Sequence, residues 1–222
     1  MGHDGMHKVS IFGDRSGPRR ILALGAHADD IEIGCGGTLL RLAAEGRELE
    51  VLWVVFCAPA ERAAEARASA GAFLRGVPQA KVIVQDHRDG YLPYAGATVK
   101  EEFEALKLQF PPDLVFTHYR EDRHQDHRLV SELTWNTWRD HLILEYEIPK
   151  YDGDFGAPNF FSSLPRSTLD RKIALLLEHF PSQANKPWFT EDLFRAVARI
   201  RGMECVAAEG LAEGFYCRKA RF

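Results

Sequence analysis

The chain has 222 residues, enough to bury a substantial core but few for two full domains. Its formal net charge is −4 and it contains no run of Lys and Arg, which argues against a nucleic-acid surface or a polybasic membrane anchor. Its apolar runs are as long as strands, and none approaches the roughly 20 residues that span a bilayer. We therefore expect one globular domain with a small-molecule partner, no nucleic acid and no membrane span.

The N-terminal segment and the cysteines bear on location. Residues 1–18 are rich in Gly and polar residues and contain no continuous apolar segment before a cleavage site, which argues against a signal peptide. The cysteines show no C-x-x-C pair or other zinc-binding spacing, so we expect free thiols in a reducing compartment. The sequence favours a cytoplasmic protein with a loose extension over residues 1–18 and one domain over residues 19–222.

Strands and helices are predicted to alternate along the domain. RRILALGA at residues 19–26 is typical of a buried strand, Gly36-Gly37-Thr38 is expected to open a helix, and ELEVLWVVF at 48–56 is a second strand. The pattern repeats with a helix at 61–74, a strand at 81–85, a helix at 100–110, a strand at 113–118, a helix at 126–139 and a strand at 142–147. This alternation predicts an α/β fold, Rossmann-like, with a mostly parallel sheet and helices on both faces.

The C-terminal part departs from this alternation. Two amphipathic helices are predicted at residues 171–180 and 191–201, and GFYCRKARF at 214–222 is predicted as a late strand. The segment PKYDGDFGAPNFFSS at 149–163 is rich in turn formers and aromatics. It fits two interpretations equally, a loop over the functional site and a surface connection.

Two polar clusters follow predicted strands. GAHADD, residues 25–30, lies at the carboxyl end of the first strand, and THYREDRHQDH, residues 117–127, lies at the end of the fourth. In the common doubly wound order 3-2-1-4-5 these strands are neighbours at the topological switch point, where ligand crevices form. We therefore expect the two clusters to face one crevice.

The residue types in the clusters suit metal-assisted hydrolysis. Two imidazoles and a carboxylate are a standard ligand set for a catalytic zinc that keeps an open position for water. His27 and Asp30 are three residues apart across a turn, and His124 and His127 share one face if a helix begins there. A carboxylate beside the metal can take a proton from the water, and Asp29 is the candidate. Spacing alone does not separate the roles of His124 and His127.

Each cluster also has a simpler interpretation. An Asp29-Asp30 pair after a strand is often only a turn and a helix cap, and His124 and His127 alone are typical of an exposed helix start. The occurrence of both clusters at neighbouring strand ends favours a site. The glycines of GCGGT match neither G-x-G-x-x-G nor a P-loop, and close helix packing explains them.

Taken together, GAHADDIEIGCGGTL and HQDH resemble the PIG-L/LmbE-like deacetylases, whose hallmarks are AHPDD and HxDH. The resemblance extends to an R-x-x-E pair at Arg62 and Glu65, a D-G at Asp89 and Gly90, and PPDLVFTH before the second cluster. Ala28 stands where the family usually has Pro, which loosens the turn although Ala can adopt the same geometry. The resemblance implies a Rossmann-like fold, in agreement with the pattern of strands and helices.

The resemblance also implies an activity and a ligand set. It implies a zinc-dependent amidohydrolase that removes the N-acetyl group of an N-acetylglucosamine-type amino sugar or conjugate. His27, Asp30 and His127 would bind zinc, and Asp29 would activate a zinc-bound water. Fe²⁺ or Co²⁺ suit the same ligands. The family resemblance also favours a homo-oligomer.

Further roles follow from the same resemblance. His124 would face the substrate carbonyl as an imidazolium that stabilises the oxyanion, with Asp126 orienting it. Arg62 and Asp89 correspond to positions that hold sugar hydroxyls, and a cation beside a carboxylate suits a polyol. The alternative for Arg62 and Glu65 is an exposed helix pair.

Two other functions compete with hydrolysis. His27, Asp29 and His127 also match the two-His, one-carboxylate triad of non-haem iron oxygenases, but those enzymes generally carry it on an antiparallel barrel. A non-catalytic sugar-binding module on the same fold is the second alternative. It is disfavoured because every catalytic position is filled.

Overall fold

A computed structural model describes residues 6, 8–12, 17–46 and 48–221 of the chain. The predicted loose extension over residues 1–18 falls in good part outside these residues, so it stays a prediction. No helix in the described ranges combines the length and the apolar character needed to cross a membrane.

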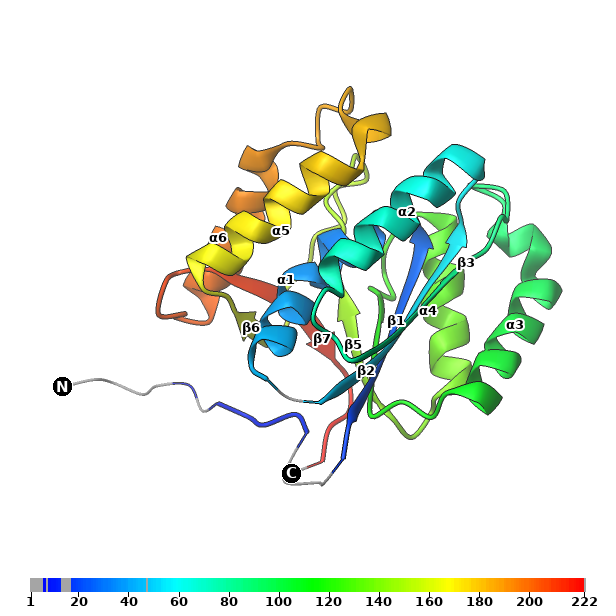
Figure 1. The fold of residues 1–222 in the computed structure, drawn as a ribbon, viewed down its shortest axis with the longest axis horizontal. Coiled ribbons are helices and arrows are strands. Elements are labelled where there is room, and N and C mark those ends of the chain that lie inside the picture. Colours follow the sequence, from blue (N-terminus) through cyan, green and yellow to red (C-terminus); the bar gives the residue numbers. More distant parts are fainter. Residues whose placement is uncertain (1–5, 7, 13–16, 47, 222) are drawn as a thin grey trace.

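A seven-stranded sheet forms the centre of the molecule, in the order β3-β2-β1-β4-β5-β7-β6 (Figure 1). Five strands are mutually parallel: β1 (Arg19–His27), β2 (Leu49–Cys57), β3 (Gln79–Val84), β4 (Leu114–His118) and β5 (Leu142–Tyr146). At one end β7 (Ala212–Cys217) pairs antiparallel with both β5 and β6 (Phe160–Ser163). The predicted order 3-2-1-4-5 and the mostly parallel sheet are confirmed.

Helices cover both faces of the sheet, as predicted (Figure 1). One face packs against α1 (Asp30–Ala44), α2 (Ala60–Phe73), α5 (Arg166–His179) and α6 (Glu191–Glu204), and the other against α3 (Gly96–Gln109) and α4 (Gln125–Thr137). Short 3₁₀ helices lie at Leu92–Ala95 and Pro181–Gln183. The alternation of β1 divides the core: Ile21 and Ala23 join one cluster, and Leu22 and Leu24 join the other.

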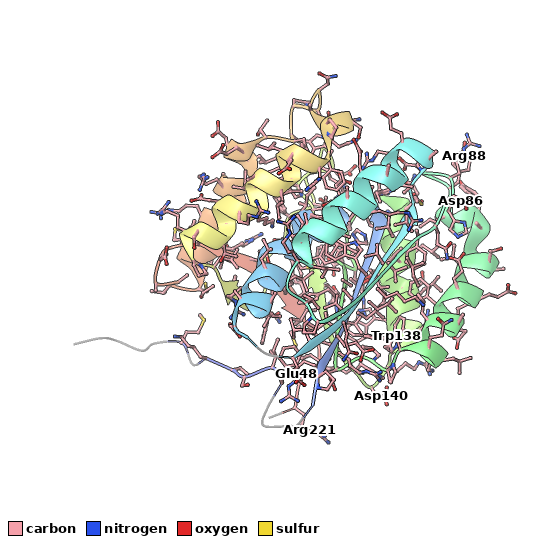
Figure 2. All side chains as sticks on the ribbon, viewed as in Figure 1. Glu48, Asp86, Arg88, Trp138, Asp140 and Arg221 are labelled. Atoms are coloured by element: carbon pink, nitrogen blue, oxygen red, sulfur yellow. The ribbon has the colours of Figure 1, made fainter. Side chains whose placement is uncertain are left out.

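The parallel strands all begin on one side of the molecule and end on the other. Asp86 and Arg88 follow β3 and lie on the side where the parallel strands end (Figure 2). Glu48 and Asp140 precede β2 and β5 and lie on the opposite side, where the strands begin (Figure 2). Residues that follow the parallel strands therefore gather at the carboxyl ends of the strands, where the sequence predicts the site.

Helix α1 begins at Asp30, so the prediction that it opens at Thr38 was wrong. The glycines that suggested a helix start lie inside the helix, where they permit close packing. A Cβ atom on Gly36 would lie 2.6 Å from the Phe73 ring, and one on Gly37 would lie 2.6 Å from Leu164. These glycines are needed because residues distant in the sequence pack against them. Helix propensity depends on neighbouring residues in the sequence and so could not predict this.

The C-terminal predictions were right in type and wrong in extent. The late strand predicted from residue 214 begins at Ala212 and ends at Cys217. The last four residues of segment 149–163 form β6, and residues 147–159 connect β5 to β6 at the sheet edge. The connection therefore joins two strands of the same sheet, β5 and β6, which are separated by β7.

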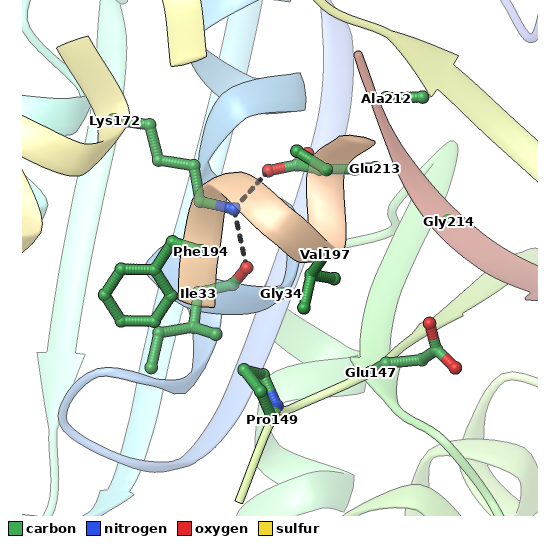
Figure 3. A pocket seen from close by; sticks show the side chains of 11 residues that line it. Ile33, Gly34, Glu147, Pro149, Lys172, Phe194, Val197, Ala212, Glu213 and Gly214 are labelled. Atoms are coloured by element: carbon green, nitrogen blue, oxygen red, sulfur yellow. Dashed lines mark hydrogen bonds and ion pairs between the residues drawn. The ribbon is translucent and has the colours of Figure 1, made fainter. Parts of the chain in front are cut away.

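A buried ion pair fixes the middle of α1 to the C-terminal part (Figure 3). The amides of Gly37 and Thr38 donate to the Glu213 carboxylate at 2.8 and 2.7 Å. Lys172 donates to Glu213 and to the carbonyl oxygen of Ile33, both at 2.6 Å. The pair therefore satisfies backbone groups of α1 that would ordinarily bond within a helix. An adjoining cavity of about 30 Å³ can hold a water molecule, and none of the predicted metal ligands lines it.

Candidate metal and catalytic site

The two predicted clusters meet where β1 and β4 end. His27 is the last residue of β1 and Asp30 the first of α1, whereas His127 lies in the first turn of α4. Strands β1 and β4 are hydrogen-bonded neighbours, so residues 100 positions apart in the sequence come into contact. The two clusters therefore meet at the switch point, as the sequence predicted.

Three side chains present donor atoms to one point. Nδ1 of His27 lies 3.1 Å from Nε2 of His127 and 3.3 Å from Oδ2 of Asp30, and the last two atoms are 3.5 Å apart. A tetrahedral zinc with bonds of 2.0 to 2.1 Å separates its ligand atoms by about 3.3 Å. The three side chains therefore fit a tetrahedral metal ion with one position left open.

Other sets of donors overlap with this one. His27, His124 and His127 form one set, Asp30, His118 and His127 another, and His27, Asp89, His124 and Asp126 a third, each with donor atoms within 4.8 Å of one another. All three sets share members with the His27–Asp30–His127 triangle, so they describe one polar centre.

A carboxylate stands behind each of the two histidines in the triangle. Nε2 of His27 lies 3.2 Å from Asp126 and 3.1 Å from Asp89, and Nδ1 of His127 lies 2.9 Å from Asp122. Such partners fix the tautomer and ring orientation of a metal-binding His and raise its basicity. Asp122 was not predicted from the sequence, because it lies in the charged stretch REDR, where no local pattern marks its contact with His127.

The predicted role of Asp126 needs correction. Its carboxylate accepts hydrogen bonds from the amides of Gly90 and Leu92, at 2.7 and 3.1 Å, and contacts His27. Its link to His124 is through the backbone, because the Asp126 amide donates to Nδ1 of His124. The carboxylate therefore orients His27 and the loop after β3 in place of His124. The resemblance had implied a contact of this carboxylate with His124.

His124 caps the N-terminus of α4. Because Nδ1 accepts from a backbone amide, the proton of the neutral ring lies on Nε2. Burial and the neighbouring His27 lower the pKa of His124. These observations favour a neutral ring that donates from Nε2 over the imidazolium that the resemblance implied.

Asp29 has the environment of a base. Its side chain is buried, Oδ1 accepts from Arg62 at 2.9 Å, and Oδ2 has no hydrogen-bond partner among the described residues. Burial raises the pKa of Asp29, with the Arg62 charge opposing and the Asp30 charge adding to the shift. The side chain makes no capping hydrogen bond to α1, so the interpretation of Asp29 as only a helix cap does not hold.

Arg62 forms an ion pair with Asp29. The resemblance had implied that Arg62 contacts sugar hydroxyls. Its Nε is 3.6 Å from Glu65, whose carboxylate accepts from the amide and the hydroxyl of Ser182 at 2.9 and 2.6 Å. The side chains of Arg62 and Glu65 are 22% and 11% exposed, so they are not the exposed helix pair considered above. They join the candidate base to the turn after α5.

Asp89 lies at the mouth of the site. Its side chain is 69% exposed, yet Oδ1 is 3.1 Å from His27. Gly90 follows with a φ of +79°, a conformation that glycine adopts without strain, which explains the D-G pair. The exposure leaves Asp89 accessible to a ligand.

His118, the last residue of β4, received no role from the sequence. It is fully buried, its Nε2 accepts from the Ala26 amide at 2.9 Å, and its ring stacks on His127 with centroids 3.9 Å apart. Since the backbone amide occupies the Nε2 lone pair, that atom is not available to a metal, and the His118 ring supports His127 from behind. Its place at the carboxyl end of a central strand was the signal that it faces the site.

A buried His–Asp–His donor set at the switch point of a parallel sheet defines an α/β enzyme with a candidate metal centre. The chain belongs to the PIG-L family, since the family model described as GlcNAc-PI de-N-acetylase matches residues 22–138. The chain is also similar to YaiS, an uncharacterised deacetylase of Escherichia coli K12, with 30% identity over 174 residues that cover 72% of this chain and 89% of that protein. The predicted family is confirmed, and so is the enzyme class, an amidohydrolase of the deacetylase type.

Solved structures show the same fold. The N,N'-diacetylchitobiose deacetylase of Pyrococcus horikoshii aligns with a TM-score of 0.67 and 21% identity, over 93% of this chain and 88% of that one. The 4-carboxy-2-hydroxymuconate hydratase of Pseudomonas putida aligns with a TM-score of 0.69 and 18% identity, over 92% and 98%. The fold thus carries more than one reaction, and the assignment of a reaction depends on the site.

Proposed function

We propose that the protein is a metal-dependent deacetylase that hydrolyses the N-acetyl group of an N-acetylglucosamine-type amino sugar or conjugate. The observation that carries this proposal is the triangle of His27, Asp30 and His127 with the unpaired Oδ2 of Asp29 beside it. The family description and the Pyrococcus structure, both concerned with N-acetylated amino sugars, support the substrate class.

His27, Asp30 and His127 would hold the metal. A bound divalent ion would polarise the substrate carbonyl and lower the pKa of a water molecule. Two imidazoles and a carboxylate suit zinc first, and Fe²⁺ or Co²⁺ can occupy the same donors. One of the similar structures is the zinc-inhibited form of the teicoplanin deacetylase Orf2, which links zinc to that protein.

Asp29 takes the proton of the attacking water on Oδ2. Arg62 holds Oδ1, so the free oxygen is the one available to the water. A base is most effective when its pKa approaches the working pH, and burial moves the pKa of Asp29 upward in that direction. The protonated Asp29 can then return the proton to the nitrogen that leaves.

His124 donates a hydrogen bond from Nε2 to the substrate carbonyl oxygen. Negative charge develops on this oxygen as the tetrahedral centre forms, and an oriented donor there stabilises it. The backbone of Asp126 fixes the ring, so the donor is in place before the reaction. Asp89, exposed at the mouth, accepts from a hydroxyl of the amino sugar.

The test is acetate release from a panel of N-acetylglucosamine derivatives by the zinc-loaded protein, with Asp29→Ala measured beside it. Release by the wild type and loss in the variant support the proposal. Saturable binding of a panel member without release, with metal shown to be bound, supports the sugar-binding module and contradicts a deacetylase acting on that substrate. The predicted cytoplasmic location and homo-oligomeric state stay predictions.

A further inference from the structure

A buried ionic cluster joins the segment after β5 to the loop after β4. Nζ of Lys150 lies 2.9 Å from Oδ2 of Asp122 and 2.6 Å from Oδ2 of Asp154. The three side chains are only 9%, 2% and 8% exposed. Asp154 also accepts from the amide of Arg123 at 2.8 Å. Segment 149–159, whose role the sequence left open, is therefore attached to the loop that precedes the metal donors.

The cluster reaches the site through Asp122. The same Oδ2 that accepts from Lys150 lies 2.9 Å from Nδ1 of His127, and Oδ1 accepts from the His124 amide at 2.8 Å. One carboxylate thus touches the backbone of the candidate oxyanion donor and the ring of a candidate metal ligand. Lys150 is one contact away from both.

The two candidate histidine ligands differ in how their carboxylate partners are held. Asp126, behind His27, is fixed by two backbone amides of the loop after β3. Asp122, behind His127, is held by one backbone amide, that of His124 on Oδ1, and by the Lys150 ammonium on Oδ2. Lys150 therefore provides on the His127 side the second restraint that a second backbone amide provides on the His27 side.

Burial makes this restraint strong. Removal of one member of a buried ion pair leaves its partner desolvated and uncompensated. Without Lys150, the Asp122 and Asp154 carboxylates would face each other across a buried space with no cation between them. The Asp122 carboxylate would then move, and the hydrogen bond that orients the His127 ring would move with it.

We propose that Lys150 is a positioning residue that holds the Asp122 carboxylate in the orientation that aims Nε2 of His127 at the metal. Lys150 thus links the segment after β5 to the metal site through Asp122. This inference rests on the proposed function, because it assumes that His27, Asp30 and His127 bind a metal ion.

The test measures metal binding directly on the full chain. Lys150→Met removes the charge and the donor at nearly constant length. Competition of zinc with a chromophoric chelator should show a dissociation constant raised about tenfold, as is usual when a partner of a ligating His is disturbed. The visible absorption bands of the Co²⁺-loaded protein should also shift, because the geometry at the His127 nitrogen changes. Lys150→Arg, which keeps a cation and donors, should restore most of the affinity.

Asp154→Asn is the matched control. It weakens the attachment of segment 149–159 but leaves the contact between Lys150 and Asp122, so zinc affinity and the Co²⁺ spectrum should stay those of the wild type. Unchanged zinc binding in Lys150→Met would overturn the proposal. So would an equal loss of affinity in Asp154→Asn, since general packing would then explain the effect. If Lys150→Met does not fold, Lys150→Gln is judged by the same criterion.

A further variant separates this inference from the proposed function. His127→Ala should abolish tight zinc binding. If His127→Ala binds zinc as the wild type does, the metal centre itself is refuted. If His127→Ala loses zinc while Lys150→Met retains wild-type affinity, only the positioning role of Lys150 is refuted.

Discussion

Replacement of Asp29 by Asn should remove the base and leave the metal in place. The side chain is 5% exposed, its Oδ1 accepts from Arg62, and an amide oxygen can still accept that bond. The amide cannot take a proton at the position of the unpaired Oδ2. Loss of a general base typically costs 10²- to 10⁴-fold in rate, so kcat should fall by at least about 100-fold. This corresponds to about 3 kcal/mol or more in activation free energy.

The neighbouring residue provides the comparison. Oδ2 of Asp30 lies 3.3 Å from Nδ1 of His27 and 3.5 Å from Nε2 of His127, so Asp30→Asn removes a negative charge from the metal donors themselves. Acetate release and bound metal should be measured on the same samples of both variants. Asp29→Asn should be metal-replete and slow, whereas Asp30→Asn should be metal-depleted. Release of metal by Asp29→Asn with retention by Asp30→Asn would refute the assignment of roles within the pair.

Four further predictions concern the metal, the base, the core and the thiols. Removal of metal by a chelator should abolish acetate release and lower the melting temperature, and added zinc should restore both, because ligands that bind only the folded state stabilise it. In Arg62→Met the charge that opposes the raised pKa of Asp29 is lost, so the acid limb of kcat/KM should move to higher pH, with bound metal unchanged. Lys172→Met leaves the buried Glu213 without its cation and should lower the free energy of unfolding in urea by about 3 kcal/mol. Burial raises the pKa of Cys57 to about 12, so about one thiol in 10⁴ is ionised at pH 8. Iodoacetamide should therefore leave Cys57 unmodified in the folded protein, which mass spectrometry can measure.

The order of the parallel strands and the place of the site could be predicted because both depend on the apolar patterns of neighbouring residues in the sequence. Alternating apolar strands and amphipathic helices predict a doubly wound sheet, and the topology then places residues after the first and fourth strands together. His27, Asp30 and His127 were therefore expected at one place, and the structure brings them into contact there.

The partners of the site residues did not follow, because long-range contacts decide them. Asp126 was assigned to His124 by resemblance, but its carboxylate contacts His27 and the amides of Gly90 and Leu92. Arg62 was assigned to the substrate by resemblance, and its hydrogen bond to Asp29 was not foreseen because it depends on the packing of α2 beside α1. Asp122 went unnoticed because one charged residue in a polar stretch carries no signal of the lysine it will meet.

The pairing of Glu213 with the middle of α1 also has a consequence for biosynthesis. The five parallel strands and the site residues lie within the first 146 residues of the chain, but the carboxylate that binds the Gly37 and Thr38 amides is on β7, among the last strands to be made. Chains fold from the N-terminus during synthesis, so the contacts of Glu213 with the first helix can form only when the ribosome has nearly finished. We expect a nascent chain stalled before β7 to contain every candidate catalytic residue and yet to remain sensitive to proteolysis within α1.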